Sequence, residues 1–250
     1  MQIIVDGLLV DYTTRGRGPV MLLLHGWGDR AATFERLTAH FEAKYTCVSV
    51  DLPGFGASEP PHEAWSLGDY ARFVHHFLDK AKLSSVSVLV GHSNGGAIAL
   101  KAVQTGEMTV EKLVLLASSG IRPKKTIKTS IITVGAKVGG VLTRLLPRSQ
   151  QRELRVKVYN KLGSDFLAVP HMAETFKKVV REDVSADLSR VKVPVLLVNG
   201  ADDTDVPLWI GKKFQHLLPH ATLTVVSGTG HFVHIDALDQ TATAIQEFLQ

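Results

Sequence analysis

The stretch "LVGHSNGGAIAL" (residues 89–100) decides the fold of this chain. Its first residues form an apolar run typical of a buried strand, and its last residues are small and apolar, as in a closely packed helix. Between them lies "GHSNG" (91–95), a G-x-S-x-G pattern. At a strand-to-helix junction this pattern predicts a very sharp turn that projects the serine hydroxyl, with glycines where side chains would collide. An ordinary glycine-rich turn is the alternative, so the rest of the sequence has to decide.

Short apolar runs that end in turns recur on both sides of this stretch. They are "VMLLLHG" (20–26), "CVSVDLPG" (47–54), "VSVLVGHS" (86–93), "KLVLLASSG" (112–120), "VPVLLVNG" (193–200) and "ATLTVVSG" (221–228). Runs of this kind suit strands that are buried on both faces. Helical patterns lie between most of them, at 31–44, 66–83, 94–104, 207–218 and 236–249. This alternation predicts an α/β fold with a mostly parallel sheet and helices on both faces.

Two regions depart from the alternation. At the N-terminus, "QIIV", "DG" and "LLVDY" predict a hairpin, because Asp-Gly suits the tight turn between paired strands. Residues 121–190 contain no convincing strand, but 129–146, 148–163 and 164–182 have helical patterns. We therefore expect a core domain formed by residues 1–120 and 191–250, with residues 121–190 as a helical cap inserted over one edge of the sheet.

Acidic and histidine side chains follow the last two predicted strands. Three aspartates lie in "ADDTDVP" (201–207), and His231 and His234 lie in "TGHFVHID" (229–236). A serine hydroxyl needs a base to become a nucleophile, usually a histidine that a carboxylate orients. Carboxyl ends of parallel strands meet at one edge of the sheet, so these groups should approach Ser93. After residues 20–26, the backbone N–H of Trp27 could join that of Asn94 in binding an oxyanion.

With these pieces in place, nearly the whole sequence resembles the α/β-hydrolase family. The matching stretches are "HGWG" (25–28), "DLPGFGAS" (51–58), "GHSNGG" (91–96), "GADDTDVP" (200–207) and "GHFVHID" (230–236). The resemblance implies an α/β-hydrolase fold with a cap and a catalytic triad. In the family the acid lies four residues before a proline, which selects Asp203, and the catalytic histidine directly follows a glycine, which selects His231. The resemblance also implies that the backbone N–H groups of Trp27 and Asn94 form the oxyanion hole.

Several residues remain as alternatives to these assignments. Asp202 and Asp205 compete with Asp203, although the first suits a turn and the second a solvated surface. His234 could replace His231 as the base only if the turn were shifted. His92 is adjacent to Ser93 in a sharp turn, where neighbouring side chains point apart, and His25 is expected to support the oxyanion turn. Asn94 departs from the methionine, glutamine or leucine that many family members have there, which leaves substrate preference open.

The expected activity is acyl transfer to water through Ser93, His231 and Asp203. The resemblance favours a carboxylic ester as substrate, and a serine nucleophile argues against the related haloalkane dehalogenases and epoxide hydrolases, which use aspartate. Amides, thioesters, lactones and carbon–carbon bonds are open alternatives, because the same groups cleave them. A non-catalytic ligand receptor on the hydrolase fold is the alternative from another class. No cofactor is expected, and no metal either, because neither an H-x-x-x-H pattern with a glutamate nor paired cysteines occur.

Composition limits the remaining possibilities. The chain has 250 residues, 45% of them hydrophobic, and a net charge of +4, which is too mild to predict nucleic-acid binding. The single cysteine, Cys47, should be buried in a strand. Neither a signal peptide nor an apolar run of membrane-spanning length is apparent, so a cytoplasmic location is expected. The oligomeric state is not predicted.

The positive charge is concentrated in residues 121–190. This region holds 15 of the 28 Lys and Arg residues but only 6 of the 24 Asp and Glu residues. Its net charge is therefore +9, and that of the remaining residues of the chain is −5. A solvated helical surface is the simpler explanation. The alternative is attraction of an anionic acyl substrate or of an anionic membrane surface.

Overall fold

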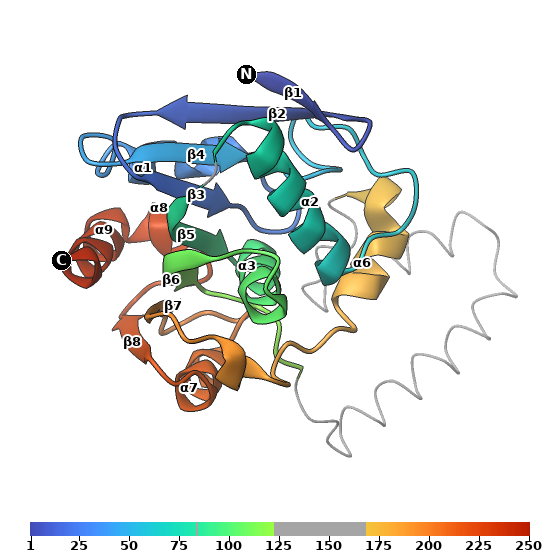
Figure 1. Cartoon of the computed structure of the whole chain (residues 1–250). Helices are drawn as coiled ribbons and strands as arrows, with labels where there is room; N and C mark the ends of the chain where they lie inside the picture. The colour runs from blue at the N-terminus through green and yellow to red at the C-terminus, as the bar shows by residue number, and fades with distance from the viewer. Residues whose placement is uncertain (84, 123–168) are drawn as a thin grey trace, which may run out of the picture. The chain divides into compact units, whose positions relative to one another are not determined.

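The computed structural model describes residues 1–83, 85–122 and 169–250, and it contains an eight-stranded sheet. The strands follow the order β1-β2-β4-β3-β5-β6-β7-β8 (Figure 1). Their bounds are β1 Gln2–Val5, β2 Leu8–Arg15, β3 Val20–Leu24, β4 Thr46–Val50, β5 Val86–His92, β6 Val110–Leu116, β7 Val195–Gly200 and β8 Ala221–Val226. All neighbours from β4 to β8 are parallel, whereas β1 and β2 form an antiparallel edge. The predicted α/β fold with a mostly parallel sheet is confirmed.

The N-terminal hairpin forms where the sequence predicts it. Asp6 and Gly7 both have positive φ, 50° and 82°, as a tight two-residue turn between twisted strands requires. Strand β1 pairs with β2 from Gln2 opposite Asp11 to Val5 opposite Leu8. The hairpin therefore extends the parallel sheet by an antiparallel edge.

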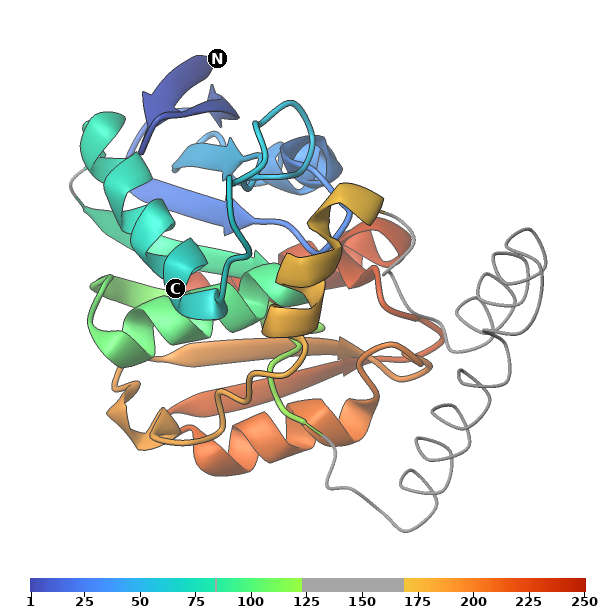
Figure 2. The same cartoon turned by 90° about the vertical axis from the view of Figure 1, so that its right-hand side faces the viewer.

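Helices cover both faces of the sheet, and Figures 1 and 2 show α2, α3 and α7 on one face and α1 and α9 on the other. Their bounds are α1 Glu35–Thr38, α2 Leu67–Lys80, α3 Asn94–Thr105, α7 Leu208–Leu217, α8 Val233–Asp236 and α9 Leu238–Leu249, with a 3₁₀ turn η1 at Ala31–Phe34 before α1. The helix expected over 31–44 is thus shorter. Beyond Ala39 the chain continues in turns, and the Glu42 carbonyl accepts the N–H of Arg17 from the loop after β2.

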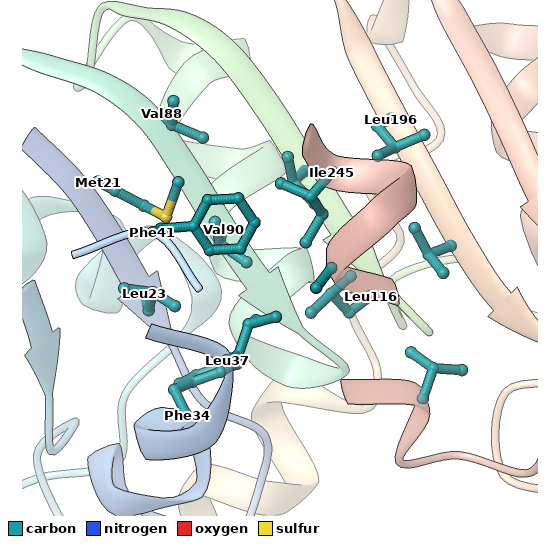
Figure 3. Close-up of a cluster of buried hydrophobic side chains, with 14 of the residues drawn as sticks. Met21, Leu23, Phe34, Leu37, Phe41, Val88, Val90, Leu116, Leu196 and Ile245 are labelled. Atoms are coloured by element: carbon teal, nitrogen blue, oxygen red, sulfur yellow. The ribbon is translucent and has the colours of Figure 1, made fainter. Parts of the chain in front are cut away.

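Alternating side chains of the central strands fill the two sides of the sheet. Met21 and Leu23 of β3 and Val88 and Val90 of β5 point toward α1 and α9, where Ile245 of α9 packs against them (Figure 3). The intervening residues of β3 are also fully buried, against the opposite face. Because both faces are covered, these strands consist of continuous apolar runs. The rigid sheet then fixes the loops at its carboxyl edge.

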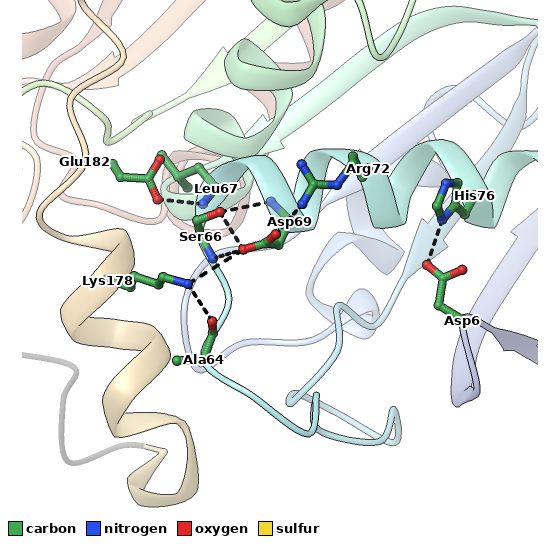
Figure 4. Close-up of polar contacts among 9 residues, drawn as sticks. All are labelled: Asp6, Ala64, Ser66, Leu67, Asp69, Arg72, His76, Lys178 and Glu182. Atoms are coloured by element: carbon green, nitrogen blue, oxygen red, sulfur yellow. Dashed lines mark hydrogen bonds and ion pairs between the residues drawn. The ribbon is translucent and has the colours of Figure 1, made fainter.

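Helix α2 begins at a capping box. The Ser66 hydroxyl accepts the N–H of Asp69, and the Asp69 carboxylate accepts the N–H of Ser66 at 2.7 Å (Figure 4). The first backbone donors of a helix lack partners within it, and this exchange satisfies two such donors. The Ser66–Asp69 spacing recognised in the sequence therefore sets the start of α2.

The helix α6 (Ala173–Val179) and the residues after it are bonded to this same helix start. Lys178 donates to the carbonyl of Ala64 at 2.9 Å, and Glu182 accepts the N–H of Leu67 at 2.8 Å (Figure 4). A 3₁₀ turn, η4 (Pro170–Met172), precedes α6, and another, η5 (Leu188–Arg190), leads to β7. These bonds fix the chain that returns to the sheet.

The chain divides into two compact units, one formed by residues 1–121 and 171–250 and the other by residues 122–170. The expected helices at 129–146 and 148–163 lie outside the described residues, and the expected boundaries of the cap at 121 and 190 stay a prediction. Within the described residues, no helix is both long and apolar enough to span a membrane.

Candidate active site

Ser93 occupies a strained turn between β5 and α3. Its φ of 50° and ψ of −114° are unusual for a residue with a side chain, and such strain is typical of functional positions. A Cβ on Gly91 would lie 2.6 Å from the carbonyl oxygen of Gly95, and one on Gly95 would overlap the carbonyls of Leu24 and His25. The two glycines are therefore required for two different reasons: one lets the turn close, and the other lets it approach the end of β3.

The loop after β3 lies against this turn. A Cβ on Gly26 would lie 3.3 Å from the Cβ of Ser93, so the backbone at Gly26 and Trp27 is next to the serine. Asn94 is the first residue of α3, where backbone N–H groups have no acceptor within the helix. The two N–H groups expected to bind an oxyanion thus belong to segments that flank Ser93. The Trp27 ring packs edge-on against Phe55, with ring centroids 4.9 Å apart.

Asp203 and His231 meet beyond the ends of β7 and β8. The distance between His231 Nδ1 and Asp203 Oδ2 is 2.8 Å, and the other carboxylate oxygen accepts the N–H groups of Asp205 and Val206 at 2.9 and 2.8 Å. The Asp203 side chain is fully buried, whereas Asp202 and Asp205 are exposed. Because a carboxylate can only accept, Nδ1 of His231 carries a hydrogen, and the neutral form of the ring therefore has its lone pair on Nε2. Such a histidine is oriented to act as a base through Nε2.

The loops that carry these two residues interlock. A Cβ on Gly200, at the end of β7, would overlap the carbonyls of Thr229 and Gly230, and the Asp202 N–H donates to the Thr229 carbonyl at 3.0 Å. The His231 side chain is 11% exposed, so solvent or a substrate can reach it, whereas the Asp203 side chain is fully buried. This combination suits a base that exchanges protons with a bound molecule.

His25 supports the loop after β3. Its Nδ1 donates to the carbonyl of Gly26 at 2.7 Å, and its Nε2 accepts the N–H of Leu52 at 2.9 Å. The side chain is completely buried, and this burial lowers its pKa. The ring is therefore neutral at neutral pH, which the acceptor role of Nε2 requires. The supporting role expected for His25 agrees with these contacts.

Two further buried histidines, His92 and His234, lie close to His231. His92 donates from Nε2 to the backbone carbonyl of His231 at 3.1 Å, and the His92 and His234 rings are 4.5 Å apart. Burial, followed by the neighbouring His234 and His231, lowers the pKa of His92 well below its usual value. Burial, followed by His231, lowers the pKa of His234 to about 3. Both rings are neutral, and neither is the histidine that meets Asp203.

Asp51 is a structural residue of this edge that the sequence reasoning missed. Its two carboxylate oxygens accept the N–H groups of Ala31 at 2.6 Å and Ala57 at 2.8 Å, and its carbonyl accepts the Ser58 hydroxyl at 2.7 Å. An aspartate directly after an apolar run and before "LPGFGAS" was the signal available in the sequence. The partner Ala31 is distant in sequence, so the role becomes visible only in the fold.

Comparisons with known proteins agree with the fold and identify the family. A sequence model described as "Alpha/beta hydrolase family" matches residues 21–244. The chain is 28% identical over 264 residues to the uncharacterized hydrolase YugF of Bacillus subtilis, covering 98% of this chain and 96% of that protein. It is also 28% identical over 256 residues to a pimeloyl-[acyl-carrier protein] methyl ester esterase of Aliivibrio salmonicida, covering 96% and 95%. The fold matches a thermophilic esterase from Thermogutta terrifontis with a TM-score of 0.76 at 19% identity, covering 100% and 98%.

Proposed function

Because this chain belongs to the α/β-hydrolase family, we propose that it is a serine hydrolase that cleaves carboxylic esters through Ser93, His231 and Asp203. The observation that carries the proposal is the 2.8 Å contact between His231 Nδ1 and the buried Asp203 carboxylate, at the sheet edge that presents Ser93. This contact leaves Nε2 of His231 free of the proton that it must accept.

In the first half of the reaction, Ser93 Oγ attacks the carbonyl carbon of the ester. His231 Nε2 takes the hydroxyl proton, and Asp203 stabilises the imidazolium that forms. The N–H groups of Trp27 and Asn94 bind the negative oxygen of the tetrahedral intermediate. His231 then gives the proton to the leaving alcohol, and the acyl group stays on Ser93.

In the second half, a water molecule attacks the acyl-enzyme. His231 accepts a proton from this water and returns it to Ser93 as the acid leaves, so the enzyme ends as it began. Water must reach the acyl carbon from the side of His231, and the partial exposure of that side chain is consistent with this requirement.

The choice of an ester rests on the relatives. The pimeloyl-[acyl-carrier protein] methyl ester esterase acts on an ester by its name, and the identity of 28% extends over almost both whole chains. The net charge of +9 in residues 121–190 further favours an anionic acyl substrate, because a positive region attracts it before binding. Such steering changes association more than chemistry.

The test is a panel of p-nitrophenyl esters of increasing acyl length, together with a matched amide, thioester and lactone. We expect ester turnover that is lost in Ser93→Ala. Stabilisation by ligands without turnover of any member would overturn the proposal in favour of a receptor, and a preference for another bond would correct the substrate class.

A second measurement tests the anionic preference. The ratio of kcat/KM for an anionic ester to that for a neutral ester of the same length should fall as salt rises, because screening shortens the Debye length to about 3 Å at 1 M. The kcat values should change little. A ratio that does not respond to salt contradicts steering and leaves the basic residues as a solvated surface.

A further inference from the structure

Three side chains that the proposed triad does not use converge behind Ser93. Their possible ligand atoms, a carboxylate oxygen of Asp29 and ring nitrogens of His92 and His234, all lie within 4.8 Å of one another. Each comes from a different segment of the active site. Asp29 lies in the loop after β3, His92 ends β5, and His234 lies in α8, three residues after His231.

The polar atoms of this cluster are buried without partners. Asp29 Oδ2, His92 Nδ1 and both ring nitrogens of His234 make no hydrogen bond within the described part of the chain. His92 and His234 are each only 1% exposed. Buried polar atoms nearly always have a partner, so three side chains with such atoms in one cluster call for a ligand.

In two of the three side chains, His92 and Asp29, hydrogen bonds to other atoms leave a lone pair for the cluster. His92 donates from Nε2 to the carbonyl of His231, so its Nδ1 carries a lone pair. One oxygen of Asp29 accepts the N–H of Arg30 at 2.8 Å and the Thr33 hydroxyl, which leaves Oδ2 for the cluster. Histidine and carboxylate ligands of metals are typically held by such outer hydrogen bonds.

We propose that Asp29, His92 and His234 form a binding site for a divalent transition metal ion, with Zn²⁺ as its representative. Two imidazoles, one carboxylate and a water molecule make a common four-coordinate zinc set. Zinc bonds of about 2.0–2.1 Å would bring the ligand atoms to about 3.3 Å from one another, closer than the 4.8 Å within which they now lie. A water molecule alone would supply hydrogen bonds to the same atoms but would leave the carboxylate charge uncompensated.

The site would join three segments that position the proposed reaction. Asp29 lies two residues after Trp27, His92 precedes Ser93, and His92 also holds the backbone of His231. A bound ion would therefore stabilise the folded chain and hold these three segments in their positions relative to one another. Its role is structural, because no step of the proposed reaction uses Asp29, His92 or His234.

Metal binding is tested on the purified full chain, without an affinity tag, after dialysis against EDTA. Zn²⁺ is added, and its stoichiometry and Kd are measured by equilibrium dialysis with elemental analysis. Thermal unfolding is followed in parallel. We expect one Zn²⁺ per chain and a Tm that rises with zinc concentration, since a ligand that binds only the folded state stabilises it.

Variants assign the ion to this cluster. Asp29→Asn is nearly isosteric and retains the contacts of the other oxygen, and His234→Gln removes the α8 ligand. Each should weaken zinc binding about 100-fold and abolish the Tm shift. His216→Gln, at an exposed histidine of α7, is the matched control and should bind like the wild type.

A second acidic and histidine group, Asp203, Asp205 and His231, could also bind zinc. His231→Ala removes that group and should still bind one Zn²⁺. Binding lost in His231→Ala but kept in Asp29→Asn would overturn the proposal by placing the ion at the triad. Absence of stoichiometric binding would overturn it in favour of a buried water. Neither readout depends on turnover, so Ser93→Ala protein can be used, and the ester proposal is tested separately.

Discussion

His92, the residue before the turn serine, holds the backbone carbonyl of His231 through a 3.1 Å hydrogen bond from its Nε2. The bond spans 139 residues and connects the end of β5 to the loop after β8. The segment that presents Ser93 therefore also positions the histidine that meets Asp203. The His92 ring, whose centroid lies 4.8 Å from that of the His231 ring, thus helps to position the proposed base.

Replacing His92 should test this connection. His92→Leu removes the donor and leaves the His231 carbonyl unpaired, so we expect the free energy of unfolding to fall by about 1–3 kcal/mol and kcat to fall about tenfold. His92→Gln retains an N–H that can reach the carbonyl and should recover part of both. Urea unfolding and ester kinetics on EDTA-treated protein measure the effects. Equal kcat in the leucine variant and the wild type would contradict a positioning role.

Ser93→Ala should remove the proposed nucleophile without disturbing the fold. Turnover should fall by roughly 10⁴–10⁶-fold, as it does when triad members are removed from other serine hydrolases. A fluorophosphonate probe should label the wild type at Ser93, as peptide mass spectrometry can show. The assignment fails if the probe labels another residue and the alanine variant remains active.

Asp203→Asn should preserve the fold but offer His231 an amide in place of a carboxylate. The amide can donate to Nδ1, which favours the wrong tautomer and fails to stabilise the imidazolium, so kcat should fall by about 10⁴. Asp202→Asn and Asp205→Asn are matched controls, because both side chains are exposed. Kinetics on all three variants separates the residues. If kcat falls strongly in Asp202→Asn but stays normal in Asp203→Asn, the assignment is wrong and Asp202 is the acid.

Gly95→Ala should damage the turn at Ser93. The added methyl group would overlap the carbonyls of Leu24 and His25, which belong to the backbone at the end of β3 and cannot move easily. We expect a loss of about 3 kcal/mol in the free energy of unfolding, together with loss of activity. Gly230→Ala is the control, since an added Cβ there has no atom within 4 Å and should cost less than about 0.5 kcal/mol. Similar denaturation midpoints for the two variants would contradict the packing argument.

Cys47 should be chemically silent in the native protein. It is 1% exposed in β4, and burial, followed by the charge of Glu42, raises its pKa to about 12. The thiolate is the reactive form, so its reaction with a disulfide reagent at pH 8 should be roughly 10³-fold slower than in the unfolded chain. Colorimetric titration should give one thiol in urea. Rapid labelling of the native protein would show that β4 is accessible.

The order of strands and helices was predictable from the sequence, because buried parallel strands require continuous apolar runs. The start of α2 was predictable for a similarly local reason, the Ser66–Asp69 capping box. The length of the helix after β3 was not, since its apolar spacing continues to residue 44 although the chain forms turns beyond Ala39, where the Glu42 carbonyl accepts the N–H of the distant Arg17. Local patterns determine elements, whereas their ends are less well marked in the sequence.

The candidate site shows the same division. By itself, the sequence determined which residue types follow each strand, and with the family resemblance it selected Ser93, Asp203 and His231. Only the tertiary structure decided that Asp203 is buried and bonded to His231, that His92 holds the backbone of that histidine, and that Asp29 faces His92 and His234. The physical reason is that burial and hydrogen-bond direction arise when separate loops meet at one edge of the sheet.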